Sequence, residues 1–134
     1  MAGYSDRSLV DKLGIKPGMR IAIIDSPHGF AATLGKLPAR VTVTHDVRGV
    51  LPFIHFFAVD REVLKKRFAR LKRALEPAGT LWISWPKKTS GVATDLTEDV
   101  VRAIALAGGL VDVKVAAVDE VWSALKLVRR LKDR

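Results

Sequence analysis

The sequence predicts a three-layer α/β fold whose sheet is mostly parallel, with about six strands and a C-terminal antiparallel hairpin. Residues 20–25 and 53–59 are almost continuously apolar, as in strands that are buried on both faces of a parallel sheet. Segments with apolar residues at helical spacing alternate with the strands, which predicts helices packed against the sheet. The chain has 134 residues, the usual size of one domain, so we expect a single domain over residues 1–134.

Caps, turns and apolar spacing predict the individual elements. Ser5 or Asp6 is expected to cap a first helix that ends at Gly14, because glycine readily adopts the left-handed conformation that follows helices. Pro77 and Gly79 are expected to end the third helix. The predicted elements are helices over residues 6–14, 27–35, 60–75 and 97–107 and strands over residues 20–25, 41–44, 53–59, 80–85, 110–118 and 122–131. The last two strands are too close in sequence for a crossover helix, so they are expected to form the hairpin.

The composition describes a basic protein without cysteine. The formal net charge is +9 and the pI is about 10.3, and the absence of cysteine excludes disulfides and thiolate metal sites. No signal-peptide pattern and no bilayer-length apolar run are found, so we expect a cytoplasmic protein with no membrane partner. The basic helix 60–75 and the C-terminal tail are expected to form an ordinary solvated surface, with a nucleic-acid-binding face as the alternative.

A ligand site is expected where the winding of the parallel sheet reverses, at the carboxyl ends of the strands. If the strand 53–59 pairs beside the strand 20–25, opposite the strand 41–44, the reversal lies between the first and third strands. The loops that follow these strands then meet at one edge. The candidate ligand-binding residues in these loops are Asp25, His28, Gly29, Asp46, Trp85, Lys87, Lys88 and Ser90.

The strongest candidate site is an anion-binding site before a helix N-terminus, formed by Lys87, Lys88 and Ser90. The alternative is a solvated loop with Trp85 packed on the core. The spacing is not that of a Walker loop, and the anionic ligand is expected to be a small molecule.

The histidines carry weaker alternatives. His28 is a candidate general base oriented by Asp25 or Asp46, or simply a turn residue, and no catalytic residue is predicted. His55 lies in the middle of an apolar strand and is expected to be a core histidine. His28, His45 and Asp46 lack the close ligand spacing of a zinc site, so no metal is predicted.

Two segments resemble the scaffold of class I methyltransferases, a Rossmann-like fold. Leu13-Gly14-Ile15-Lys16-Pro17-Gly18-Met19-Arg20-Ile21 is similar to the lead-in to their first strand. Residues 71–81 are similar to their helix, "L-x-P-G-G" turn and next strand, and Gly108-Gly109 with the final hairpin also matches. This resemblance implies the fold and places S-adenosylmethionine among the ligands to consider.

The chain departs from that family at the cofactor turn. The turn Asp25-Ser26-Pro27-His28-Gly29-Phe30 holds one glycine, Pro27 lacks an amide donor, and His28 and Phe30 are expected to fill the ligand space. The family's usual extra strand–helix unit after the second strand is replaced by a short loop over residues 47–52. Asp46 can mimic the ribose-binding carboxylate of the family, but S-adenosylmethionine is not predicted as a cofactor.

A second resemblance covers the whole chain. The chain is similar to the bacterial domain-of-unknown-function family 3052 in three segments: Gly3-Tyr4-Ser5, residues 85–97 and Val118-Asp119-Glu120-Val121-Trp122-Ser123. This resemblance implies a methyltransferase-like fold and no particular activity. The leading hypothesis is therefore a non-catalytic binding or regulatory module for an anionic ligand. The alternatives are a divergent S-adenosylmethionine-dependent methyltransferase and a non-specific nucleic-acid-binding protein.

Overall fold

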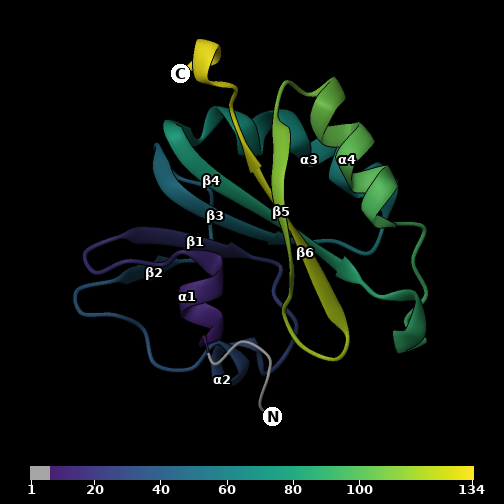
Figure 1. The fold of residues 1–134 in the computed structure, drawn as a ribbon, viewed down its shortest axis with the longest axis horizontal. Coiled ribbons are helices and arrows are strands. Elements are labelled where there is room, and N and C mark those ends of the chain that lie inside the picture. The colour runs from purple at the N-terminus through teal and green to yellow at the C-terminus, as the bar shows by residue number, and fades with distance from the viewer. Residues whose placement is uncertain (1–6) are drawn as a thin grey trace.

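Six strands form one sheet in the order β2-β1-β3-β4-β6-β5 in the computed structural model, which describes residues 7–134 (Figure 1). The strands are β1 Arg20–Ile24, β2 Thr42–Thr44, β3 Leu51–Phe57, β4 Leu75–Pro86, β5 Val111–Ala117 and β6 Trp122–Val128. The helices are α1 Leu9–Leu13, α2 Phe30–Leu34, α3 Arg61–Arg73 and α4 Glu98–Ala107, with 3₁₀ turns η1 Lys88–Ser90 and η2 Leu131–Asp133.

The pairing directions confirm the predicted fold class. β1 pairs in parallel with both β2 and β3, and β3 pairs in parallel with β4. β6 is antiparallel to both β4 and β5, which makes the C-terminal hairpin. Because β1 lies between β2 and β3, the winding reverses between β1 and β3, as the sequence predicted.

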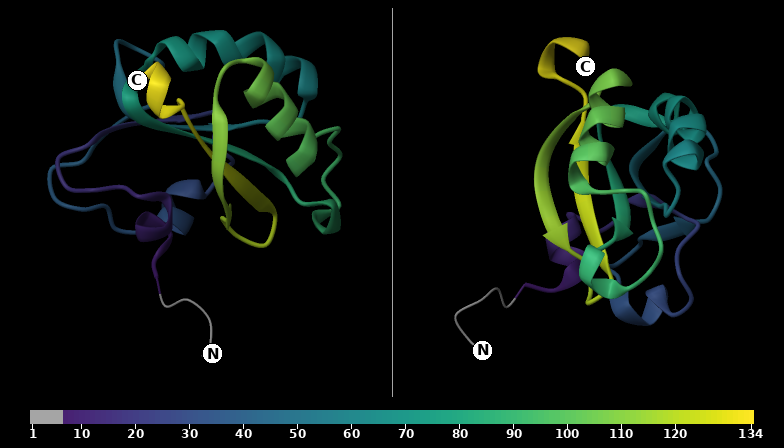
Figure 2. Two further views of the ribbon diagram at one scale, coloured as in Figure 1. Left: turned by 45° about the horizontal axis from the view of Figure 1, so that its top comes forward. Right: turned by 90° about the vertical axis from the view of Figure 1, so that its right-hand side faces the viewer.

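Alternating residues of the strands supply two hydrophobic cores. Ala22 and Ile24 of β1 pack in the core that contains α3 and α4, whereas Ile21 and Ile23 pack in the core that contains α1 and α2. This alternation follows from the twofold repeat of a strand and places helices on both faces of the sheet (Figure 2). One buried hydrogen bond links the layers: the Trp82 indole Nε1 donates to the Leu13 carbonyl oxygen at 2.9 Å.

Several predicted boundaries were wrong. Ser8 caps α1 by accepting from the Asp11 amide, while Ser5 and Asp6 lie outside the described residues. α2 begins at Phe30 rather than at Pro27. β6 ends at Val128, short of the predicted end at residue 131.

The end of α3 is the largest of these differences. The helix stops at Arg73, and β4 already begins at Leu75, which pairs with Leu51. Pro77 and Gly79 therefore lie inside β4, in a register shift between the Leu51–Leu75 and Phe53–Thr80 pairs. Such an irregularity tolerates proline, since the ladder hydrogen bond that proline lacks is not needed there.

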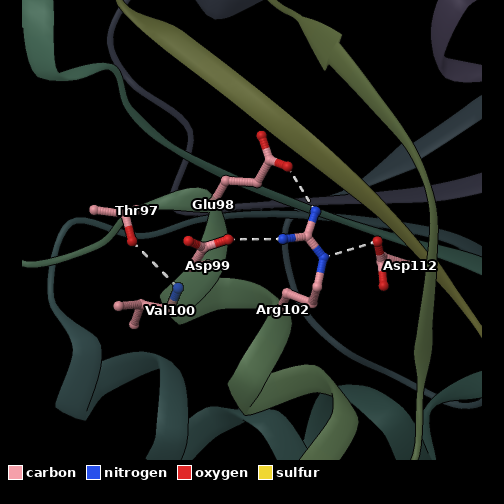
Figure 3. A network of polar contacts seen from close by, with 6 residues as sticks. All are labelled: Thr97, Glu98, Asp99, Val100, Arg102 and Asp112. Carbon is pink, nitrogen blue, oxygen red and sulfur yellow. Dashed lines mark hydrogen bonds and ion pairs between the residues drawn. The ribbon is translucent and has the colours of Figure 1, made fainter.

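Charged side chains fasten α4 to β5 (Figure 3). Thr97 caps the helix, its Oγ1 accepting from the Val100 amide at 3.2 Å. The Arg102 guanidinium then donates to Glu98 at 2.6 Å, to Asp99 at 2.9 Å and to Asp112 of β5 at 2.9 Å. The hydrogen bond from Arg102 lowers the pKa of Asp112, because it stabilises the carboxylate.

No helix among residues 7–134 has both the length and the apolar character needed to cross a bilayer.

Candidate functional site

Two hollows lie at the carboxyl edge of the sheet, one on each side of Asp25. The larger, about 390 Å³, is lined by the end of β1, the segment after β2 and the side of α3. The smaller, about 230 Å³, is lined by the segment between β3 and α3 and by Trp122. Asp25 lines both, so the first residue after β1 stands at the point where a sheet of this topology binds ligands.

The larger hollow is polar. It is lined by Ile24, Asp25, His45, Asp46, Val47, Arg48, Arg67 and Arg70. Arg67 Nη1 lies 3.5 Å from Asp25 Oδ2, and Arg48 Nη2 lies 3.7 Å from Asp46 Oδ2. These distances are longer than those of charge-assisted hydrogen bonds, and all four side chains are at least 39% exposed, so both pairs are weak.

His45 adds an oriented ring to this hollow. Its Nδ1 lies 3.0 Å from the Ile23 carbonyl oxygen. Because a carbonyl only accepts hydrogen bonds, Nδ1 is the nitrogen that carries the proton whenever the ring is neutral, and Nε2 then has the lone pair. The Ile23 contact therefore leaves His45 with a hydrogen-bond acceptor available to a ligand.

The smaller hollow is mostly apolar. It is lined by Asp25, Phe57, Ala58, Val59, Asp60, Val63 and Trp122. Phe57 and Trp122 pack edge to face, with ring centroids 5.2 Å apart. The Asp60 carboxylate already accepts the amides of Glu62 and Val63 as the cap of α3. Of the two acidic side chains in this hollow, Asp25 is therefore the one that does not cap a helix.

The turn after β1 is more open than its sequence predicts. Phe30 is only 4% exposed, packs edge-on against His55 and Phe57 in the core, and lines neither hollow. The turn reverses the chain through two left-handed residues, Asp25 at φ 57° and Gly29 at φ 85°. His28 and Gly29 are exposed, and a Cβ at Gly29 would meet nothing within 4 Å. The chain itself leaves the approach to Gly29 free.

The Lys87–Ser90 segment is bound into the fold. Lys87 Nζ donates to the Asp119 carbonyl at 2.7 Å, and its amide donates to the Val121 carbonyl at 2.7 Å. Ser90 Oγ donates to the Lys87 carbonyl at 2.7 Å, and Trp85 is 5% exposed in the core. Lys88 remains exposed. Neither hollow beside Asp25 is lined by any of these four residues, so the structure separates them from Asp25 and Asp46, and anion binding by them stays a prediction.

His55 is a core residue, as predicted. It is 1% exposed, its Nε2 lies 2.6 Å from Ser84 Oγ, and its ring stacks on Phe57. Nδ1 is buried and has no hydrogen-bond partner. Burial lowers the pKa of His55 to about 3, because the charged form loses its hydration. Within residues 7–134, no group of three His, Asp or Glu side chains is arranged to hold a metal.

Sequence reasoning missed the part of the site that α3 contributes. Arg67 and Arg70 were interpreted as part of a basic helix, but their spacing of three residues places both on one side of α3, facing the polar hollow. That spacing was a usable signal. The contribution of Trp122, which comes from the last strand, had no local signal because strand order decides it.

Comparison with solved structures identifies the class of fold. No protein-family model and no curated sequence match this chain. The structure is similar to a SAM-dependent methyltransferase from Aquifex aeolicus, with a TM-score of 0.67 and 16% identity over 89% of this chain and 86% of the other. It is also similar to a ribosomal protein L11 methylase from Lactobacillus delbrueckii subsp. bulgaricus, with a TM-score of 0.62 and 14% identity over 91% and 75%.

A third similar structure was determined with its ligand. Magnesium protoporphyrin IX methyltransferase from Synechocystis with bound SAM matches with a TM-score of 0.57 and 13% identity over 91% of this chain and 74% of the other. At these identities the likeness concerns the fold alone. The protein therefore has a Rossmann-like, methyltransferase-like fold, and its function must be argued from its own residues.

Proposed function

We propose that this protein binds S-adenosylmethionine across Asp25 and acts as a divergent methyltransferase. The observation that carries the proposal is the position of two carboxylates, Asp25 after β1 and Asp46 after β2, on one hollow at the strand-reversal edge. Such edges are where open α/β sheets bind nucleotide-like ligands. The second hollow, on the other side of Asp25, extends the site toward the end of β3.

The residues present fit the parts of such a ligand. The Asp46 carboxylate is 71% exposed and can accept hydrogen bonds from ribose hydroxyls. Asp25 attracts the cationic end of the ligand, and the apolar hollow beside Phe57 and Trp122 can receive its aliphatic part. When bound, S-adenosylmethionine supplies an activated methyl group. Phe30 lines neither hollow, so its side chain does not occupy the proposed site.

Two features favour weaker binding than a glycine-rich turn provides. Pro27 has no amide to donate, and Arg67 already contacts Asp25 at 3.5 Å. A ligand must therefore compete with Arg67 for the carboxylate of Asp25.

Isothermal titration calorimetry with S-adenosylmethionine and with its demethylated product tests the proposal. Asp46→Asn should weaken binding about tenfold, since a charged hydrogen-bond acceptor becomes neutral. Asp133→Asn, in η2, is the matched control and should bind like the native chain. Absence of heat for both ligands with the native protein, or equal affinities of all three proteins, contradicts the proposal.

A non-catalytic anion-binding module is the second candidate, favoured by the arginines of the polar hollow. Arg48, Arg67 and Arg70 line it, and within residues 7–134 the guanidinium of Arg70 has no hydrogen-bond or ion-pair partner. A free guanidinium beside a hollow can pair with phosphate or carboxylate. Titration with a panel of nucleotides and phosphorylated metabolites separates the two candidate functions. The anion-binding module is supported if the protein binds a member of the panel, if Arg70→Gln abolishes that binding, and if S-adenosylmethionine gives no response.

A further inference from the structure

A groove lies between α3 and α4, away from the carboxyl edge. The two helices lie side by side on one face of the sheet (Figures 1 and 2). The groove has a volume of about 760 Å³. It is lined by Arg61, Lys65, Phe68, Ala69, Lys72, Arg73, Val100, Ala103, Ile104, Ala107, Gly108 and Arg129. None of these residues lines the hollows beside Asp25.

The bottom and the α4 wall of the groove are apolar. Phe68 is 4% exposed at the bottom, and Val100 and Ile104 are partly buried against the same core. Short side chains, those of Ala69, Ala103 and Ala107, leave the space between the helices unfilled. Gly108 also lines the groove, and a Cβ at this position would overlap the Phe68 ring, so α4 can pack here only with glycine. The groove is therefore a built feature of the α3–α4 packing.

The charged residues of the groove all have the same sign. Arg61, Lys65, Lys72, Arg73 and Arg129 are basic, and no acidic residue is among those that line it. Lys65 has one weak partner, Glu62 at 3.5 Å, and both side chains are more than half exposed. Arg129 donates to the carbonyls of Lys72, Leu75 and Glu76 at 2.7–3.0 Å. Carbonyl contacts leave the charge of Arg129 in place and hold it rigidly.

We propose that this groove docks an acidic amphipathic helix of a partner protein. The apolar wall matches the apolar stripe of such a helix, and the basic rim matches its acidic flank, as in helix-in-groove recognition. A second copy of this chain carries a formal net charge of +9 and is repelled. Nucleic acid supplies the negative charge but no apolar stripe for Val100, Ala103 and Ile104. A bilayer is too flat to enter a groove between two helices.

Fluorescence anisotropy with a designed probe tests the docking. The probe is a labelled helical peptide of about 18 residues, with leucine at i, i+3, i+4 and i+7 positions and glutamate elsewhere, long enough to span the groove. Ala103→Gln, which fills the groove without changing charge, should weaken binding at least about fivefold. Lys65→Gln/Arg73→Gln should weaken it by a similar factor and flatten its salt dependence. Lys16→Gln/Lys36→Gln removes the same charge outside the groove and should have little effect.

Control ligands make the test specific. A peptide with the same glutamates but serine in place of leucine should bind at least about tenfold more weakly, since the apolar contact is lost. Equal binding of the serine peptide, or no effect of Ala103→Gln in a protein that still melts cooperatively, overturns the proposal. It is also overturned if a single-stranded oligonucleotide or anionic phosphatidylserine vesicles bind more tightly than the leucine peptide and displace it. S-adenosylmethionine binding is not involved in any of these outcomes.

Discussion

Arg67 of α3 and Arg102 of α4 belong to the two helices that cover one face of the sheet, but their surroundings are opposite. Arg102 donates to three carboxylates at 2.6–2.9 Å and is 29% exposed, with α4 and β5 on either side. Arg67 meets one carboxylate at 3.5 Å, lies 5.1 Å from the Phe56 ring centroid, is 39% exposed and faces a hollow of about 390 Å³. All three guanidinium nitrogens of Arg102 already donate to carboxylates of the protein, whereas Arg67 retains capacity for a ligand.

The same distinction separates the other polar groups of the molecule. His55 and Ser84 are buried against each other, and Lys87 is bonded to the chain, so all three belong to the architecture. Asp46, His45 and Arg70 lie on the open hollow. Substitutions of side chains that are bonded within the protein should therefore change its stability. Substitutions of side chains that line the hollow should instead change its affinity for a ligand.

Acidification should produce the largest effect, through His55. Its pKa is about 3 in the folded protein and 6.5 as an ordinary value, so below pH 6.5 only the unfolded state takes up the proton. The free energy of unfolding should fall as the pH decreases, with a slope approaching about 1.4 kcal/mol per pH unit. Urea unfolding at pH 7, 6 and 5 measures this slope. The double variant His55→Phe/Ser84→Ala should lose most of it, and an unchanged slope in that variant contradicts the assignment.

Substitution of Arg102 should have an intermediate effect. Arg102→Met leaves Glu98, Asp99 and Asp112 facing one another, so the melting temperature should drop, while Arg130→Met should leave it unchanged. Arg102 lowers the pKa of Asp112, a contribution that is present above the carboxyl's ordinary pKa of 3.8 and lost as the pH falls below it. The difference between native and Arg102→Met proteins should therefore shrink below about pH 4. A difference that is undiminished at pH 3 indicates packing rather than charge.

Substitution of Arg67 should have the smallest effect on stability. Its ion pair with Asp25 is long and exposed, so Arg67→Gln should change the free energy of unfolding by no more than about 0.5 kcal/mol. The affinity for S-adenosylmethionine should change instead, because Asp25 is released from its partner. Titration calorimetry measures the affinity, and thermal unfolding measures the stability. A large loss of stability with unchanged affinity would show that Arg67 is a structural residue, like Arg102.

Local patterns predicted most of the fold. Apolar runs identified β1 and β3, and Asp60 was expected near the start of α3, where it caps the helix. The end of α3 was wrong because Leu75 pairs with Leu51, and that long-range contact outweighs the helical spacing. The site was predicted in part. Asp25 and Asp46 share a hollow, but Trp85 and Lys87 are used by the core and by Asp119.

The sequence by itself determined the elements, the hairpin and the carboxyl edge as the place to look, since apolar periodicity and turn residues act over a few positions. Only the tertiary structure decided which polar groups remain available. It turned Phe30 into the core, bound Lys87 to the Asp119 carbonyl and brought Arg67 and Arg70 to Asp25. Whether a side chain is free depends on partners far away in the chain, and strand order and helix packing choose those partners.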